Sequence, residues 1–318
     1  MPAPRVSDDE FIELCEKLGM RGTAKKLGGA DKNVTQRRQR LERRLGRTIA
    51  YPATPWDHAR VILPPQLAWR AELSVPEGIV LVASDAHYWP GETTTMHRAL
   101  VAFAREYKPR AIIMNGDVLD LPRASRHAPI GWENRPAISE EIEWGQERLH
   151  EVEKAAGRAE KIWTAGNHDL RFETRIANLA PEYAKVHRVH LHDHFPLWRT
   201  AWSAWINDDV VVKHRFRGGI HAVYNNVLHS GKHSVTGHRH SAEVRGFTDY
   251  NGTRWGVDGG CLAEPNARAF VDYTEDNVKN WRSAFVLLTF RAGRVMLPEL
   301  VLKWDNEHVQ FRGEIIAV

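Results

Sequence analysis

The chain has little cysteine and no long apolar run. Its 318 residues include only two cysteines, Cys15 and Cys261, which lie far apart in the sequence. So sparse a set excludes a disulfide framework and favours a reducing compartment. No stretch approaches the roughly 18 apolar residues of a membrane span. The first fifteen residues, MPAPRVSDDEFIELC, lack the charged and apolar regions of a secretory signal. We therefore expect a cytoplasmic protein without a membrane partner.

Apolar residues are nevertheless numerous enough for a packed core. Hydrophobic residues make up 42% of the chain and include 12 tryptophans, a composition unlike that of disordered proteins. A chain of this length has room for one large domain and a small one.

Positive charge is concentrated near the N-terminus. Residues 1–50 hold 12 Lys and Arg against 7 Asp and Glu, whereas the remaining residues hold 32 against 33. All of the net charge of +4 therefore comes from the first sixth of the chain. This asymmetry predicts an anionic partner for the N-terminal segment.

The same segment has the pattern of three short helices. They are expected over residues 8–19, 21–29 and 30–46, with glycines closing the second and the third. Phe11, Leu14, Cys15 and Leu18 are the apolar positions of the first helix, and Val34, Leu41 and Leu45 those of the third. Two helices, a glycine turn and a basic helix are typical of a helix-turn-helix. Residues 33–49 also resemble the recognition-helix region of winged bacterial DNA-binding regulators. We therefore predict a small all-α nucleic-acid-binding domain over residues 1–48.

In this interpretation the third helix enters a DNA major groove. The residues expected to touch bases or phosphates are Lys32, Gln36, Arg37, Arg40 and Arg44. The alternative is a solvated basic helix that only packs against the rest of the protein.

Residues 49–75 are rich in proline and show little periodicity. Pro52, Pro55, Pro64 and Pro65 favour a linker, which could include a short arm laid over the next domain. From residue 76 onward, apolar strand-like runs alternate with helical stretches, which indicates an α/β domain over residues 76–318. The strand candidates are IVLVAS, AIIMN, KIWTA, VVVKH, SVTG and AFVLLTF.

Several of these strands are followed by potential metal ligands. In open α/β sheets, ligands gather beyond the carboxyl ends of the strands. The oxygen and imidazole groups found there suit manganese, iron, zinc or nickel. The polar residues at the strand ends are Asp85, His87, Asp117, Asp120, Asn167, His168, His214, His238 and His240.

The motifs D-x-H, G-D-x-x-D, G-N-H-D, H and G-H-x-H occur in this order. The series resembles the calcineurin-like metallophosphoesterase family over roughly residues 76–260. The later stretch NWRSAFVLLTF is also similar to the closing strands of phage and bacterial members. The resemblance implies a β-sandwich of two mixed sheets flanked by helices, and a metal-dependent phosphoester hydrolase. For a phage-encoded chain the expected location is the host cytoplasm.

The resemblance also implies two divalent cations, with Mn²⁺ the first candidate and Fe, Zn or Ni the others. It places Asp85, His87 and His240 on one ion, and Asn167, His214 and His238 on the other. Asp117 would bridge the two ions, because a carboxylate has two oxygens to share. A hydroxide between the ions would attack phosphorus. His168 would protonate the leaving group, with Asp120 orienting its imidazole.

Some of these assignments have competitors within the sequence. We favour His214 over His221, His229 and His233 because it directly follows an apolar strand, although Arg215 stands where the family often has glycine. Asp85 and Asp117 could instead be helix N-caps, and Asp169 is expected either to cap a loop or to support the ligand residues from behind. The alternating His190, His192 and His194 could bind a third metal on one strand face, or form an exposed polar strand or turn.

The substrate class depends on basic residues near the motifs. Arg123, Arg126 and His127 follow Asp120, and Arg215 and Arg217 follow His214; they could bind phosphate or be ordinary surface charge. With the basic N-terminal segment, they favour a phosphodiesterase or nuclease that acts on DNA. The alternatives are a phosphomonoesterase for nucleotides or proteins, and a DNA-binding regulator with a non-catalytic phosphoesterase scaffold. The sequence sets no oligomeric state.

Overall fold

The computed structural model describes residues 6–50, 67–275 and 277–318. The chain divides into two compact units, Met1–Pro64 and Pro65–Val318, which are considered separately here. Most of the linker predicted for residues 49–75 lies outside the described residues. Within the described residues, no helix combines the length and the apolar character that a membrane crossing requires.

The N-terminal unit is helical. Helix α1 (Asp8–Leu27) is capped at its N-terminus by Ser7, whose hydroxyl accepts a hydrogen bond from the Glu10 N–H at 3.2 Å. Gly19 lies inside α1 with φ 67° and ψ −178°, so this element consists of two helical stretches, at the positions of the first two expected helices. Helix α2 (Asp31–Leu45) follows a turn at Gly28 and corresponds to the third.

A small apolar core holds these helices together. Its buried residues are Phe11, Ile12, Cys15, Ala24, Val34, Leu41 and Ile49. Leu18 and Leu45 share the apolar spacing of the two helices but are exposed, because each lies near the end of its helical stretch.

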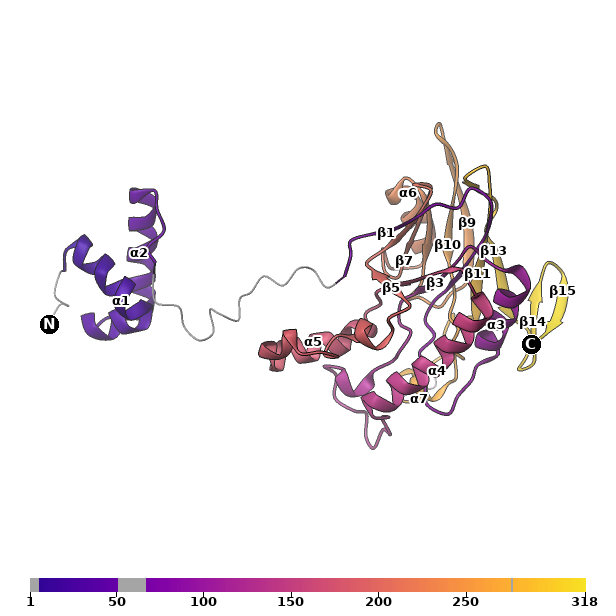
Figure 1. The fold of residues 1–318 in the computed structure, drawn as a ribbon, viewed down its shortest axis with the longest axis horizontal. Helices are drawn as coiled ribbons and strands as arrows, with labels where there is room; N and C mark the ends of the chain where they lie inside the picture. The colour runs from indigo at the N-terminus through magenta and orange to yellow at the C-terminus, as the bar shows by residue number, and fades with distance from the viewer. Residues whose placement is uncertain (1–5, 51–66, 276) are drawn as a thin grey trace. The chain divides into compact units, whose positions relative to one another are not determined.

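The second unit contains a nine-stranded mixed sheet (Figure 1). The strand order is β15-β14-β13-β11-β2-β3-β4-β5, with β12 paired to β11. Strands β2 to β5 run parallel, whereas β11 and the strands beyond it pair antiparallel. Its strands are β2 (Gly78–Ala83), β3 (Ala111–Asn115), β4 (Glu160–Thr164), β5 (Arg199–Ala201), β11 (Ala284–Arg291), β12 (Arg294–Val295), β13 (Glu299–Lys303), β14 (His308–Phe311) and β15 (Glu314–Ala317).

A six-stranded mixed sheet forms the second layer, with the order β1-β6-β7-β8-β10-β9. Strands β7, β8 and β10 are parallel to one another, and β6 and β9 are antiparallel to their neighbours β7 and β10. Its strands are β1 (Ala71–Leu73), β6 (Ala204–Ile206), β7 (Val210–Lys213), β8 (His233–Thr236), β9 (Glu243–Asp249) and β10 (Gly252–Asp258).

The core residues alternate between two interfaces, as the two-residue period of a strand requires. On β2, Val80 and Val82 pack between the two sheets, whereas Leu81 and Ala83 pack on the helical side. Helices α3 (Thr95–Tyr107) and α4 (Ile138–Ala156) contact each other and contribute to that helical side (Figure 1). Because both faces of β2 and β3 are covered, these strands are continuous apolar runs in the sequence. The unit is therefore an α/β sandwich of two mixed sheets with helices.

Shorter helices connect the remaining strands. They are α5 (Asp169–Leu179), α6 (Ala222–Ser230) and α7 (Arg268–Thr274), together with the 3-10 turns η2 (Pro122–Ala124), η3 (Pro181–Lys185) and η4 (Leu191–His194). Helix α6 packs against β8, β9 and β10.

All six strand candidates from the sequence are strands in the structure, as β2, β3, β4, β7, β8 and β11. Strand β1 was not expected, since it lies within the predicted linker. Ala71 and Leu73 pair in parallel with Ala204 and Ile206 of β6, so the sandwich extends N-terminally of residue 76.

Candidate metal centre

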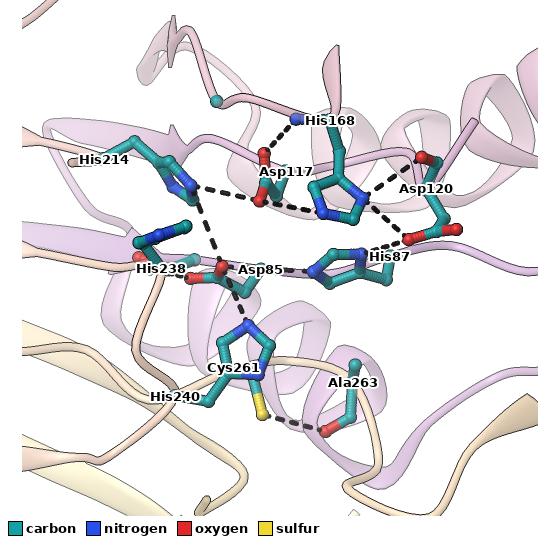
Figure 2. A network of polar contacts seen from close by, with 12 residues as sticks. Asp85, His87, Asp117, Asp120, His168, His214, His238, His240, Cys261 and Ala263 are labelled. Atoms are coloured by element: carbon teal, nitrogen blue, oxygen red, sulfur yellow. Dashed lines mark hydrogen bonds and ion pairs between the residues drawn. The ribbon is translucent and has the colours of Figure 1, made fainter. Parts of the chain in front are cut away.

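The predicted ligands lie on loops that follow parallel strands. Strands β2, β3 and β4 are parallel neighbours, so their carboxyl ends open at one edge of the nine-stranded sheet. Strands β7 and β8 do the same in the six-stranded sheet. Figure 2 shows that side chains from these five loops meet at one place. Residues up to 155 positions apart thereby come into contact, as in the pair Asp85 and His240.

The backbone at the centre is strained. Asp85, His87, Asp117, His238 and His240 have φ of 54°, 41°, 50°, 71° and 58°, respectively. Non-glycine residues in this left-handed region cost on the order of 1–3 kcal/mol each and tend to occur where function requires them. These angles therefore mark the loops as functional turns rather than simple connections.

Two motif glycines are required by close approach. A Cβ on Gly116 would lie 2.5 Å from ring atoms of His214, and one on Gly166 would lie 2.1 Å from Oδ1 of Asp117. Neither position can hold a side chain unless the polar group that faces it moves. The glycines of G-D-x-x-D and G-N-H-D thus allow the loops to close around the centre.

The polar side chains form two adjacent clusters. The first cluster consists of Asp85, His87 and His240, and the second of Asp117, His214 and His238. In each, one ligand atom per residue lies within 4.8 Å of the others. Nε2 of His214 joins the two clusters, at 3.1 Å from Oδ2 of Asp117 and 4.0 Å from Oδ1 of Asp85.

The donor atoms fit a divalent cation. Among the described residues, the buried atoms His87 Nε2 and Asn167 Oδ1 have no hydrogen-bond partner, and Nε2 of His214 faces the Asp117 carboxylate at 3.1 Å. Buried polar atoms are normally paired, so unpartnered atoms in one place indicate a missing ligand. Nδ1 of His214 donates to the carbonyl oxygen of Asn115 at 2.8 Å, so Nε2 is the ring nitrogen that faces Asp117 and that a cation would bind in place of a proton. Mixed imidazole and oxygen donors suit first-row divalent metals.

Asp117 and His214 hold each other in their charged forms. Burial opposes ionisation of Asp117, yet His214 and His168 hold the pKa of its carboxyl well below the ordinary value. Burial alone would lower the pKa of His214, but Asp117 and Asp85 raise it to about 10. A cation entering the second cluster therefore has to displace a proton from His214.

His168 lies beside the clusters and is held by Asp120. Its Nδ1 is 2.8 Å from Oδ1 of Asp120, and Nδ1 of His87 is 2.9 Å from the same oxygen (Figure 2). Burial would lower the pKa of His168, but the charge of Asp117 and the hydrogen bond to Asp120 raise it. The hydrogen bond to Asp120 thereby fixes the orientation of the ring.

Asp169 caps the loop, as expected from the sequence. Its carboxylate accepts hydrogen bonds from the N–H groups of Asp117, Val118 and Gly166 at 2.9–3.0 Å, and from Nε1 of Trp163 at 2.9 Å. It therefore ties the loop after β3 to the loop after β4.

Arg171 was not identified from the sequence. Its Nη1 donates to the carbonyl oxygen of Asp120 at 2.7 Å, and its Nη2 donates to Nε2 of His168 at 3.0 Å. The available signal was its position three residues after His168, at the start of α5, where i and i+3 side chains are neighbours. The guanidinium thus contacts both His168 and the loop that carries Asp120.

Of the four histidines that compete for the fourth motif, the structure brings His214 into the centre. His233 instead accepts a hydrogen bond from the Trp255 N–H at 3.0 Å. His221 is the residue before α6, and His229 lies within that helix. None of these three belongs to a candidate metal group within residues 6–50, 67–275 and 277–318.

The triplet His190, His192 and His194 does not lie on a strand. These residues lie in and just before the 3-10 turn η4, and the rings of His190 and His192 stack at 5.5 Å. No candidate metal group in the described part of the chain includes them. The turn alternative is the one that the structure shows.

The proposed phosphate-binding residues have different surroundings. Arg215 is exposed. The pKa of His238 is lowered mainly by burial and by the charge of His214, and the charge of Arg215 adds to this effect. Arg123 donates through Nε to the carbonyl oxygens of Arg135 and Pro136 at 2.9 Å, so it braces a loop. Arg126, His127 and Arg217 are exposed.

In the N-terminal unit, Lys32, Gln36 and Arg40 are exposed and follow one another at i, i+4 spacing along α2. Arg37 and Arg44 instead bind the carboxylate of Asp8, at 2.8 and 2.6 Å. They tie α2 to the start of α1.

Comparison with known proteins identifies the family to which the second unit is related. The model of the family described as Metallophos, calcineurin-like phosphoesterase, matches residues 79–254, which is more than half of the chain. The corresponding class of enzyme is a metal-dependent phosphoester hydrolase. The chain belongs to the calcineurin-like phosphoesterase family, whose members normally bind two divalent metals.

The search of curated proteins gave no match. Among solved structures, the chain is similar to Yfce, a phosphoesterase from E. coli. The identity is 15%, the match covers 75% of this chain and 97% of that one, and the TM-score is 0.33. It is also similar to a protein serine/threonine phosphatase from Saccharomyces cerevisiae with similarity to human phosphatase PP5. There the identity is 12%, the coverage is 86% and 96%, and the TM-score is 0.38.

Proposed function

We propose that the protein is a two-metal phosphodiesterase that cleaves DNA, with His168 as general acid. The observation that carries this proposal is the pair of adjacent ligand clusters, together with the buried atoms His87 Nε2 and Asn167 Oδ1, which have no hydrogen-bond partner among the described residues. Such atoms cost stability unless a ligand satisfies them. A site that retains them is built to bind one.

The two clusters suggest how the ions would be shared. The first cluster (Asp85, His87, His240) would hold one cation, and His214 and His238 would hold the other together with Asn167. Asp117 would contribute to both, because its carboxylate contacts His214 of the second cluster and the charge of His87 in the first cluster lowers its pKa. We propose Mn²⁺ for both positions, since oxygen and imidazole donors are mixed. Fe, Zn and Ni are the alternatives for reconstitution.

When bound, the cations would activate water and stabilise negative charge on the phosphoryl oxygens. The residues of the chain supply the remaining steps. His168 would give a proton from Nε2 to the departing oxygen, while Asp120 holds Nδ1. Arg171 would turn from Nε2 of His168 to a substrate oxygen, since an arginine binds phosphate oxygens well. Exposed basic residues that follow the motifs would add positive charge for the nucleic acid. They are Arg126 and His127 after Asp120, and Arg215 and Arg217 after His214.

The N-terminal unit would deliver the enzyme to DNA. We propose that its two-part α1 and its α2 form a helix-turn-helix, with Lys32, Gln36 and Arg40 facing the nucleic acid. Arg37 and Arg44 then serve mainly to orient α2 through Asp8. The buried free thiols of Cys15 and Cys261 are compatible with the cytoplasmic location that we propose.

The test is turnover by the metal-stripped protein after reconstitution with Mn²⁺. We expect hydrolysis of bis-p-nitrophenyl phosphate and cleavage of plasmid or single-stranded DNA, both abolished by Asp117→Asn. Turnover of p-nitrophenyl phosphate alone would replace the diesterase with a phosphomonoesterase. DNA binding without turnover of either ester would leave the non-catalytic regulator.

A further inference from the structure

A groove crosses the outer face of the six-stranded sheet. Its volume is about 570 Å³, and its floor includes Trp205, Val211, Lys213 and Ser234. These side chains alternate with core residues along their strands and therefore point away from the core between the sheets. The register places Trp205, Val211 and Ser234 in one row across β6, β7 and β8. Helix α6 packs against β8 to β10, so the side of β6 and β7 stays open.

The groove is lined by aromatic rings that reach solvent. Trp69 is 79% exposed, Trp202 41% and Phe216 44%, and Trp205 is half-buried among them. Several exposed aromatics in one groove are a feature of binding surfaces rather than of ordinary protein surface. Flat aromatic faces are also what nucleobases stack on when they are not paired.

The charge of the groove is positive. The guanidinium of Arg70 lies 4.0 Å from the Trp205 ring, and the ammonium of Lys213 lies 5.6 Å from the Phe216 ring. None of the described lining residues is acidic. Glu72 on β1 pairs with Trp205 on β6, but it is not one of the residues that line the groove. Aromatic faces interleaved with cations match a strand of alternating bases and phosphates.

A buried hydroxyl in the floor is another sign of a ligand. Ser234 is 3% exposed, and its Oγ has no hydrogen-bond partner among the described residues. A buried hydroxyl is normally paired, so this atom is available to a polar group that enters the groove.

The groove leads to the metal centre. Lys213 immediately precedes His214, and Thr236 of the floor is followed by Gly237 and His238. The two strands of the floor thus run into the loops that supply the second cluster. A polymer lying along these strands would extend toward the reacting phosphate.

We infer that this groove binds single-stranded nucleic acid, with unpaired bases on Trp69, Trp202 and Phe216 and phosphates on Arg70 and Lys213. The inference rests on the proposed nucleic-acid substrate and specifies its form. A duplex would keep its bases stacked on one another and could not use the aromatic faces. The groove therefore selects single strands or frayed ends for the metal centre.

The experiment is fluorescence anisotropy of the full chain with a labelled 20-nucleotide oligothymidylate and with a duplex of equal length, in EDTA so that no cleavage intervenes. The double variant Trp69→Ala/Trp202→Ala should bind the single strand at least about 10-fold more weakly, since two base-stacking faces are lost. Duplex affinity should change less than about 2-fold. Trp132→Ala, which removes an exposed tryptophan outside the groove, is the matched control and should leave single-strand binding unchanged.

Trp69→Phe keeps an aromatic face and should retain most of the single-strand affinity, which separates stacking from misfolding. Unchanged single-strand affinity in the double variant, or an equal loss on duplex, would overturn the inference. The inference would also be overturned if the double variant lost a dimer that the wild type forms in sedimentation but still bound nucleic acid. The groove would then be an interface between two copies of the chain. Failure of the wild-type protein to turn over bis-p-nitrophenyl phosphate would instead count against the proposed function, and the binding result would stand separately.

Discussion

Nη2 of Arg171 donates a hydrogen bond to Nε2 of His168 at 3.0 Å, while Nδ1 of the same ring lies 2.8 Å from the Asp120 carboxylate. Both ring nitrogens of His168 are therefore engaged. Because arginine is always a donor, Nε2 is an acceptor in this arrangement and carries no proton. Nε2 therefore has to take up a proton before it can give one to a leaving oxygen, and it can do so only after Arg171 turns away. A phosphate oxygen is the partner that would draw the guanidinium away.

Removing Arg171 should weaken catalysis through substrate contact. We expect Arg171→Ala to lower kcat/KM for a phosphodiester by about 10- to 100-fold, as the loss of a hydrogen bond to a charged group implies. Most of the loss should appear in KM. Arg175→Ala, an exposed arginine one turn further along α5, is the control and should have no effect. Steady-state kinetics on bis-p-nitrophenyl phosphate measure kcat and KM for both variants. Equal values for the two variants would show that Arg171 does not contact the substrate.

Loss of the general acid should depend on the leaving group. His168→Ala should retain its metal but lose about 10²- to 10⁴-fold in turnover of an alkyl phosphodiester. A nitrophenyl ester should suffer much less, because its leaving oxygen needs no proton. Parallel assays of the two esters measure the difference. If both rates fell by the same factor, His168 would not be the acid.

The space at Gly116 should control metal binding. A methyl group there would meet the His214 ring at 2.5 Å, so we expect Gly116→Ala to weaken Mn²⁺ binding by about 10- to 100-fold. Gly91→Ala is the matched control, because Gly91 has a similar φ of 85° against 78° but open space around its Cβ position. Titration calorimetry with Mn²⁺ compares the two. Equal affinities would mean that the close approach is irrelevant to the metal.

Buried Glu141 should make the protein less stable at high pH. Burial raises the pKa of its carboxyl to about 8, although it accepts a hydrogen bond from the Leu121 N–H at 2.7 Å. The folded state holds the proton to higher pH than the unfolded state, so this stabilising contribution is complete below about pH 4.5 and is lost as the pH rises through 8.

Glu141→Gln mimics the protonated acid and should remove that dependence. Between pH 5 and pH 9, the free energy of unfolding of the variant should fall by roughly 4 kcal/mol less than that of the wild type. Urea denaturation at the two pH values measures it. Parallel pH dependence in the two proteins would show that Glu141 titrates normally.

The basic face of α2 should set the salt dependence of DNA binding. Arg40→Ala should reduce the slope of log K against log salt by about 0.9, the value for one phosphate contact. Lys17→Ala removes an equal charge from α1, where Lys17 is bound to Glu13 at 2.6 Å, and should leave the slope unchanged. Salt titrations by anisotropy separate them. If both variants behaved alike, only the overall charge of the unit would matter.

The centre was predictable from the sequence because its chemistry is local. Each ligand follows an apolar strand within a few residues, and parallel strands bring their carboxyl ends together without further information. His214 could be chosen from four histidines on this basis, and the structure places it 3.1 Å from Asp117.

Contacts set by tertiary packing were not predictable. Arg171 reaches His168 only because α5 starts at Asp169 in a particular rotation. Strand β1 pairs with β6 more than 130 residues later, and its three residues carry too little periodicity to be recognised. Likewise, Arg37 and Arg44 have the spacing of DNA contacts, but Asp8 binds both. The aromatic groove required the register of β6, β7 and β8.

The central claim is that the two clusters bind a pair of cations around Asp117. The most direct test is an anomalous difference map from crystals of the Mn²⁺-loaded protein, recorded at the manganese absorption edge. We expect two peaks, one at Asp85, His87 and His240 and one at Asn167, His214 and His238, with Asp117 between them. A single peak at the neighbouring group of His87, Asp120 and His168, or no peak at saturating Mn²⁺, would contradict the account.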